Sequence, residues 1–89
     1  MWDKKSHNFN TVKYNNQSLS ADFYYQGDKR ITGFTPSCHC LTIKQIENKV
    51  TVEWKLKDPL NKPYDSRKYV TVHYSDGDND ELKLTANIC

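Results

Sequence analysis

The sequence predicts an all-β domain, an immunoglobulin-like β-sandwich of about seven short antiparallel strands. First, apolar residues alternate with polar ones in short runs, which is the pattern of strands with one buried face. Second, turn-forming residues separate these runs at regular intervals. Third, no segment offers several turns of helical spacing. Together these observations favour a sandwich over a helical or mixed fold.

Size and composition limit what the chain can be. Its 89 residues make one domain, and a domain of this size buries only about 60% of the surface that its unfolded chain exposes. We therefore expect marginal stability for an isolated chain, and neighbouring subunits would help it. Only 36% of the residues are hydrophobic and the mean hydropathy is −0.91, but the regular spacing of the apolar residues argues against disorder.

Charge and hydropathy argue against two classes of partner. The 13 basic and 11 acidic side chains are interspersed and give a net charge of +2, so we expect no basic stripe for nucleic acid. No apolar run approaches the roughly 18 residues of a membrane span. Residues 1–8 lack the apolar segment of a signal peptide, so we expect either synthesis in a cytoplasm or removal of an export signal.

The first half of the chain shows four strand patterns. Residues 8–14 form a weak first strand, and residues 19–25 alternate cleanly between apolar and polar side chains. Residues 31–34 break strict alternation around Gly33, which predicts a β-bulge. Residues 41–43 resume the alternation before a tight turn.

The second half contains the clearest strands. Residues 50–57 alternate strictly, whereas residues 58–63 contain two prolines and are predicted to be a loop, because proline cannot donate to a sheet ladder. Residues 68–75 and 82–88 alternate again on either side of a polar hairpin loop. The predicted core includes Phe23, Trp54, Val72 and Leu84.

The first seven residues are predicted to be a polar tail, and residues 8–89 the sandwich domain. Trp2 is a lone aromatic residue in this charged segment, and the predicted core does not explain it. We expect Trp2 to anchor residues 1–7 in an apolar pocket of a neighbouring protein, as hot-spot aromatic residues do. The alternative is that Trp2 folds back over its own sandwich as a lid.

Three cysteines leave at least one thiol free or paired with another chain, which suits a reducing compartment. Cys38 and Cys40 lie two residues apart on an extended segment, so their side chains point to the same side, as metal thiolates would. Zinc needs four ligands, and Cys89, His39 or His73 would complete the set. The favoured alternative is a pair of small buried thiols, and a Cys38–Cys40 disulfide that closes a very short loop is a further one.

No arrangement of residues predicts catalysis. The three histidines lack a serine nucleophile on a strained turn, and nothing specific supports Cys38 and His73 as nucleophile and base. Residues 76–80 resemble a calcium loop only in part, because Glu81 stands where such a loop needs glycine and Asn87 where it needs glutamate. We therefore expect no enzyme activity, no cofactor and a polar hairpin loop.

Four side chains are candidates for a protein contact surface: Trp2, Tyr24, Tyr69 and His73. Trp2 lies at the terminus, and the other three lie on predicted outward faces of strands. Exposed aromatic residues point to such surfaces. The alternative is ordinary cross-strand pairing, which also favours aromatic residues on sheets.

Two stretches carry a family resemblance. They are Phe23-Tyr24-Tyr25-Gln26-Gly27 and residues 31–40, which end in Ser37-Cys38-His39-Cys40. They stand for a Phe-x-aromatic-x-Asn-x-Gly motif, an Ile/Leu-x-Ile ladder and a Ser-Cys-Gly-Cys-Thr motif. From about Phe9 to Ile88 the chain resembles the bacterial family of unknown function, abundant in Bacteroidetes, that carries these motifs. His39 replaces the glycine of that family, and Leu41 replaces its threonine.

The resemblance implies an immunoglobulin-like domain of the PapD and major-sperm-protein type, a scaffold or binding module that brings no catalytic residues. We expect a non-enzymatic structural or interaction module, specifically a small auxiliary or decoration protein of a phage capsid. It would be made in the host cytoplasm and join other protein subunits in the virion. One alternative is a thiol- or metal-binding protein that uses Cys38 and Cys40. The other is an exported Bacteroidetes envelope or adhesion module, in the periplasm or at the cell surface, whose signal was removed.

Overall fold

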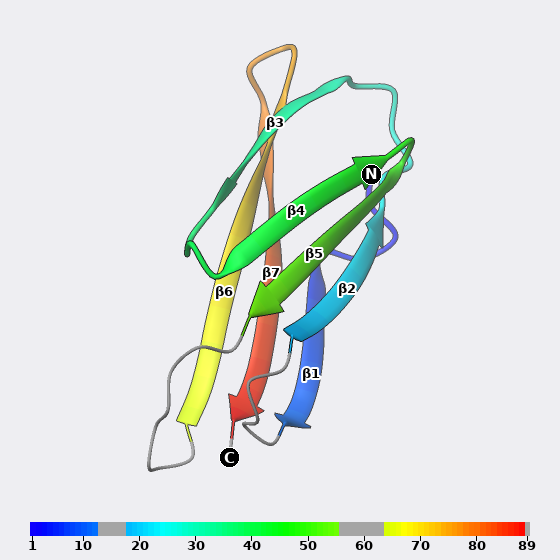
Figure 1. Cartoon of the computed structure of the whole chain (residues 1–89). Helices are drawn as coiled ribbons and strands as arrows, with labels where there is room; N and C mark the ends of the chain where they lie inside the picture. Colours follow the sequence, from blue (N-terminus) through cyan, green and yellow to red (C-terminus); the bar gives the residue numbers. More distant parts are fainter. Residues whose placement is uncertain (13–17, 56–63, 89) are drawn as a thin grey trace.

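The computed structural model describes residues 1–12, 18–55 and 64–88, and these residues form seven strands in two facing sheets (Figure 1). One sheet has four strands in the order β1-β7-β6-β3, and the other has three in the order β2-β5-β4. The strands are β1 (Ser6–Val12), β2 (Ser18–Tyr24), β3 (Ile31–Pro36), β4 (Leu41–Ile46), β5 (Lys49–Lys55), β6 (Tyr64–Tyr74) and β7 (Asn79–Ile88). The predicted all-β sandwich is confirmed.

The strand order is that of an immunoglobulin-like Greek key, with one pair that departs from the prediction. Strands β7, β6 and β3 face β2, β5 and β4, and these strands pair antiparallel within each sheet. The first strand, β1, joins the sheet of the last strand and runs parallel to β7. This parallel pair is the one exception, among the described strands, to the antiparallel strands that the sequence predicts. Both strands run toward the same end of the sandwich (Figure 1), so pairing at that edge has to be parallel.

The hydrophobic core lies between the two sheets and follows from the alternation of each strand. In β5 and β7 every second side chain is buried, as strands with one solvent face require. The four predicted core residues are buried: Phe23, Trp54, Val72 and Leu84. The ring of Phe9 packs edge-on against Trp54, with 6.2 Å between ring centroids, so β1 also contributes to the core.

The bulge predicted around Gly33 is confirmed, because the pairing of β3 with β6 shifts register between Ile31 and Gly33. Some sequence predictions lie outside the described residues. These concern residues 13–17, which include the end of the predicted first strand, residues 56–63, which include the proline loop, and Cys89.

The N-terminal segment belongs to the sandwich, and the prediction of a separate tail with Trp2 as an anchor for another protein has to be corrected. Trp2 is only 6% exposed and forms an antiparallel bridge with Tyr25. The amide of Asp3 donates to the carbonyl of Tyr24 at 2.9 Å, so the segment continues the three-stranded sheet at one end of β2. Trp2 therefore occupies an apolar site in its own chain, as in the lid alternative. Its apolar indole is removed from water by packing against the core of its own chain, so its burial needs no partner protein.

We expect Trp2→Ala to lower the free energy of unfolding by about 3 kcal/mol, the range for truncation of a large buried aromatic residue. Lys55→Ala, at an exposed position of β5, is the control and should change stability by less than about 0.5 kcal/mol. Urea denaturation of both variants measures the difference. Equal stability of the two variants would mean that the N-terminal segment is not part of the folded domain.

Candidate functional site

The four residues predicted to form a contact surface do not come together in the structure. Tyr24 lies on the outer face of the three-stranded sheet and is 40% exposed. Tyr69 and His73 lie on β6, in the other sheet, and are half-buried. Trp2 lies inside the sandwich. The four residues therefore belong to two outer faces and the core, and only Tyr24 has a markedly exposed ring.

Tyr69 and His73 take part in contacts between β6 and the β3 region. The amide of Tyr69 donates to the hydroxyl of Ser37 at 2.9 Å, and its carbonyl accepts from the amide of Ser37. The Nε2 atom of His73 lies 2.7 Å from the hydroxyl of Thr35. The Tyr69 bonds are made by its backbone, whereas the imidazole of His73 makes a side-chain contact across the two strands, as in the cross-strand alternative.

Cys38 and Cys40 lie in the connection between β3 and β4 and are joined by a disulfide, one of the alternatives that the sequence left open. Both are partly buried against the core. In this state neither sulfur is a free thiolate for a metal ion. Among the described residues, no group of three or more His, Cys, Asp or Glu side chains is arranged to hold a metal ion.

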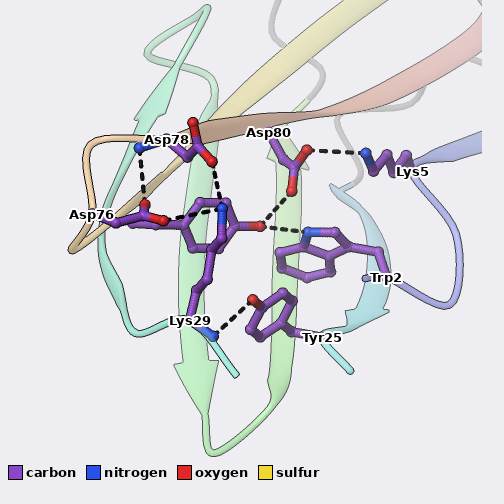
Figure 2. A network of polar contacts seen from close by, with 8 residues as sticks. Trp2, Lys5, Tyr25, Lys29, Asp76, Asp78 and Asp80 are labelled. Carbon is purple, nitrogen blue, oxygen red and sulfur yellow. Dashed lines mark hydrogen bonds and ion pairs between the residues drawn. The ribbon is translucent and has the colours of Figure 1, made fainter. Parts of the chain in front are cut away.

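The acidic turn between β6 and β7 is closed by a lysine. The Nζ atom of Lys29 lies 3.1 Å from a carboxylate oxygen of Asp76 and also contacts Asp78 (Figure 2). Hydrogen bonds to Asp78 and Asp76 raise the pKa of Lys29, so its ammonium stays charged between the carboxylates. Gly77 has φ of +91°, a conformation that side-chain-bearing residues rarely adopt. The turn is thus a polar hairpin in which a lysine ammonium lies between the two carboxylates.

A chain of hydrogen bonds ties the N-terminal segment to β6 and β7 (Figure 2). The indole N–H of Trp2 donates to the hydroxyl of Tyr74 at 2.8 Å, and this hydroxyl donates to Asp80 at 2.6 Å. The ammonium of Lys5 donates to the other carboxylate oxygen of Asp80 at 2.9 Å. The ring of Tyr25 packs against both Trp2 and Tyr74, with centroid distances of 5.1 and 5.5 Å. We call Trp2, Tyr25, Tyr74 and Asp80 the aromatic network.

The electrostatics of the aromatic network favour a fixed pattern of donors and acceptors. Burial, and then the hydrogen bond to Asp80, raise the pKa of Tyr74, so its phenol remains protonated and able to donate. The hydrogen bond from Tyr74 and the neighbouring Lys5 lower the pKa of Asp80, which remains a carboxylate that accepts. Each group therefore holds the protonation state that the other needs. This is the arrangement of a structural anchor.

The outer face of the three-stranded sheet carries exposed apolar side chains at one end. Tyr24 and Ile46 are the neighbours of Lys49 on its two sides, so the three residues form one row across the sheet. Ile46 is 67% exposed, although it is a large apolar residue. Met1, 79% exposed, is tied to the same end through the hydrogen bond from the amide of Gln26 to its carbonyl. We call Tyr24, Lys49 and Ile46 the apolar row.

The outer face of the four-stranded sheet is polar by contrast. An open groove of about 360 Å³ runs over β1, β7 and β6 and is lined mostly by Asn, Thr, Ser, Asp, Arg and Lys side chains. Within it, the amide of Asn87 donates to Asp65 at 2.7 Å. The two outer faces therefore differ in chemical character, and large apolar side chains are exposed on only one of them within the described part of the chain.

Sequence reasoning identified Tyr24 but missed Ile46 and the aromatic network. The alternation of Leu41 and Ile43 continues to an outward position at residue 46, so the pattern contained a signal for Ile46. The contact between Trp2 and Tyr74 joins residues 72 positions apart, and no local pattern reports it.

No protein-family model matches this chain, and neither does any of the curated proteins. Among solved structures, one similar chain is a 2,6-sialyltransferase from Vibrionaceae Photobacterium sp. JT-ISH-224, in a ternary complex with the donor product CMP and the acceptor substrate lactose. The TM-score is 0.49 with 11% sequence identity, and the similarity covers 97% of this chain and 18% of that one. We draw no functional conclusion from a likeness of this level.

Across residues 1–12, 18–55 and 64–88, no helix has the length and apolar character needed to cross a membrane.

We expect Asp80→Asn to lower the free energy of unfolding by about 1 kcal/mol at pH 7, the scale of a hydrogen bond to a partly exposed charged group. The lowered pKa of Asp80 means that the unfolded state binds a proton first as the pH falls below about 4. The stabilisation by Asp80 is therefore present above that pH and is lost as the pH falls through the folded-state pKa. The difference between wild type and variant should narrow in this range.

Urea denaturation at pH 7 and at several values below pH 4 measures this difference. Asp28→Asn, at an exposed position outside the aromatic network, is the control and should change stability by less than about 0.5 kcal/mol. A gap between wild type and Asp80→Asn that stays constant down to the lowest pH would contradict the assigned role of the carboxylate.

Proposed function

We propose that this domain is a non-enzymatic module that works through protein–protein contacts, and that the apolar row is part of its contact surface. The observation that carries the proposal is the position of the most exposed large apolar side chains in the described residues. Tyr24 and Ile46 lie in one row, and Met1 is at the same end of the same sheet. Scattered single apolar residues are ordinary on a surface, whereas these exposed side chains gather at one end of one sheet, as at an interaction site.

The residue types of the apolar row suit a protein interface. Full burial of an Ile side chain contributes about 1.5–3 kcal/mol relative to full exposure, so Ile46, which is 67% exposed, is a substantial anchor. Tyrosine is enriched at interfaces because its ring is apolar and its hydroxyl can still bond to a polar rim. The side chain of Lys49 lies between the two and can bury its aliphatic part while its ammonium remains in water.

Within this class of function, our specific proposal remains an auxiliary or decoration protein of a phage capsid. It is supported by the small sandwich fold, by the expected marginal stability of an isolated chain and by the lack of a catalytic pattern in the sequence. An exported envelope or adhesion module of the Bacteroidetes family type is the second candidate. The Cys38–Cys40 disulfide departs from the expectation of a reducing compartment and supports both candidates, because disulfides persist at virion and cell surfaces and in the periplasm.

The double variant Tyr24→Ser/Ile46→Ser tests the contact surface. Both side chains are exposed, so we expect the melting temperature to stay close to that of the wild type. Partner proteins recovered with the tagged chain from its source cells or particles should fall at least about tenfold, as quantified by mass spectrometry.

The matched control is Ser18→Ala/Ser20→Ala. These two exposed positions lie on the same outer face, toward the opposite end of β2 from Tyr24. It should retain the wild-type partners. Equal recovery of partners by the control and by the Tyr24→Ser/Ile46→Ser variant would show that the apolar row is not the contact surface.

A further inference from the structure

A sandwich of two open sheets has four edge strands, here β1, β3, β2 and β4. Edge strands present unpaired backbone N–H and C=O groups that can pair with another chain. Natural proteins protect them with bulges, prolines, charged residues or covering segments. The four edges of this domain are not treated alike.

Both edges of the four-stranded sheet are distorted. In β1 the register with β7 shifts between Asn8 and Thr11, and Asn10 adopts φ of +60° while its amide bonds to the side chain of Asn8. In β3 the register with β6 shifts after Ile31, and the strand ends with Pro36. A bulge or a proline prevents the regular ladder that an added strand would need.

One end of the β2 edge is covered by the N-terminal segment. The backbone N–H of Tyr24 donates to the carboxylate of Asp3 at 2.8 Å, and the C=O of Tyr24 accepts from the amide of Asp3. The amide of Gln26, next along the chain, donates to the carbonyl of Met1. The burial of Trp2 holds this cover in place.

Within the described residues, the edge of β4 has no bulge, no proline and no covering segment. Its six residues, Leu41 to Ile46, pair with β5 in unbroken register and include neither glycine nor proline. The amide of Lys55 donates to the carbonyl of Cys40, so even-numbered residues of this segment direct their backbone groups toward β5. The N–H and C=O groups of Ile43 and Gln45 therefore point away from the sheet. Lys44 is the only charged side chain along this edge.

We propose that β4 pairs antiparallel with β4 of a second copy of this chain, about a two-fold axis that places the two Ile43 residues opposite each other. The two Ile43 residues exchange both N–H···O=C bonds, and the N–H of each Gln45 donates to the C=O of Leu41 in the other copy. The two three-stranded sheets become one continuous sheet. This inference deepens the proposed function and rests on it, since it identifies one partner as a second copy.

Charge selects this register. With the Ile43 residues opposite each other, Lys44 lies beside Thr42 of the other copy. Glu53 of that copy is the neighbour of Thr42 on β5, so it lies next in line across the sheet. Within the described residues neither Lys44 nor Glu53 forms an ion pair, so both are available for this contact. In a register shifted by one residue on each strand, the two Lys44 side chains would lie directly opposite each other, which is unfavourable.

The apolar row remains outside the paired stretch. With the axis at Ile43, Ile46 would lie opposite Cys40 of the other copy. Cys40 precedes the first residue of β4, Leu41, so Ile46 has no strand partner there. Tyr24 lies two strands farther from the β4 edge. Pairing through β4 and contact through the apolar row are therefore separable by mutation.

Sedimentation equilibrium of the full chain, from micromolar to millimolar concentration, tests the proposal. We expect a monomer–dimer equilibrium for the wild type. Lys44→Glu should weaken the dimer about tenfold, because it places a carboxylate near Glu53 of the other copy. The double variant Lys44→Glu/Glu53→Lys should restore it. Lys55→Glu, on the same outer face but not on β4, should have no effect.

Gln45→Pro provides a second test, since it removes an edge N–H that is not bonded to β5. It should give a monomer with an unchanged circular dichroism spectrum. Should this variant fail to fold, the charge exchange still decides the outcome. A wild-type protein that remains monomeric at millimolar concentration would overturn the proposal. So would a dimer that is insensitive to Lys44→Glu and to the charge exchange.

The same set of variants separates this inference from the proposed function. A monomeric wild type whose partner recovery still depends on Tyr24 and Ile46 would overturn the pairing of β4 and support the apolar row. A dimer that depends on Lys44, with partner recovery unaffected by Tyr24→Ser/Ile46→Ser, would support the pairing and overturn the apolar row as a contact surface.

Discussion

Backbone hydrogen bonding at the edges of the two sheets is the constraint on which the rest of this structure depends. Every edge strand must satisfy its outward N–H and C=O groups with water, with its own chain or with another chain. The N-terminal segment satisfies those of Tyr24 and Gln26, and it holds that position because Trp2 is buried. An indole N–H inside a core needs an acceptor, and the hydroxyl of Tyr74 supplies it.

The aromatic network is supported by its immediate surroundings. A Cβ atom at Gly27 would lie 2.3 Å from the hydroxyl of Tyr25. The absence of a side chain at Gly27 therefore makes room for the Tyr25 ring. The amide of Lys29 donates to that same hydroxyl at 3.2 Å. The Lys29 ammonium lies 5.5 Å from the ring centroid of Tyr74 and also binds the acidic turn. A short loop thus holds two of the rings that receive Trp2.

Periodicity predicted the elements of the fold but not their arrangement. Alternation located the strands around Phe23, Trp54, Val72 and Leu84, and the interruption at Gly33 predicted a real bulge. The parallel pairing of β1 with β7 depends on the path of the whole chain, which alternation does not encode. Trp2 makes a single bridge, and a single bridge has no period to detect.

The same distinction holds for the candidate site. Tyr24 was identified because an outward position follows from alternation within one strand. Its place in one row with Ile46 depends on the register of both strands with β5, and the open edge of β4 depends on strand order. Such features become visible only once strands distant in sequence have been paired. The resemblance to the Bacteroidetes family and the virion role remain predictions.

Residue-resolved amide hydrogen exchange at several protein concentrations tests most directly whether one edge is open for pairing while another is covered by the chain itself. The amides of Tyr24 and Gln26 have partners within the chain and should exchange slowly at every concentration. The amides of Ile43 and Gln45 should exchange fast in dilute protein and progressively more slowly as the concentration rises. Exchange at Ile43 and Gln45 that does not depend on concentration, or exchange at Tyr24 as fast as at these positions in dilute protein, would contradict this division of the edges.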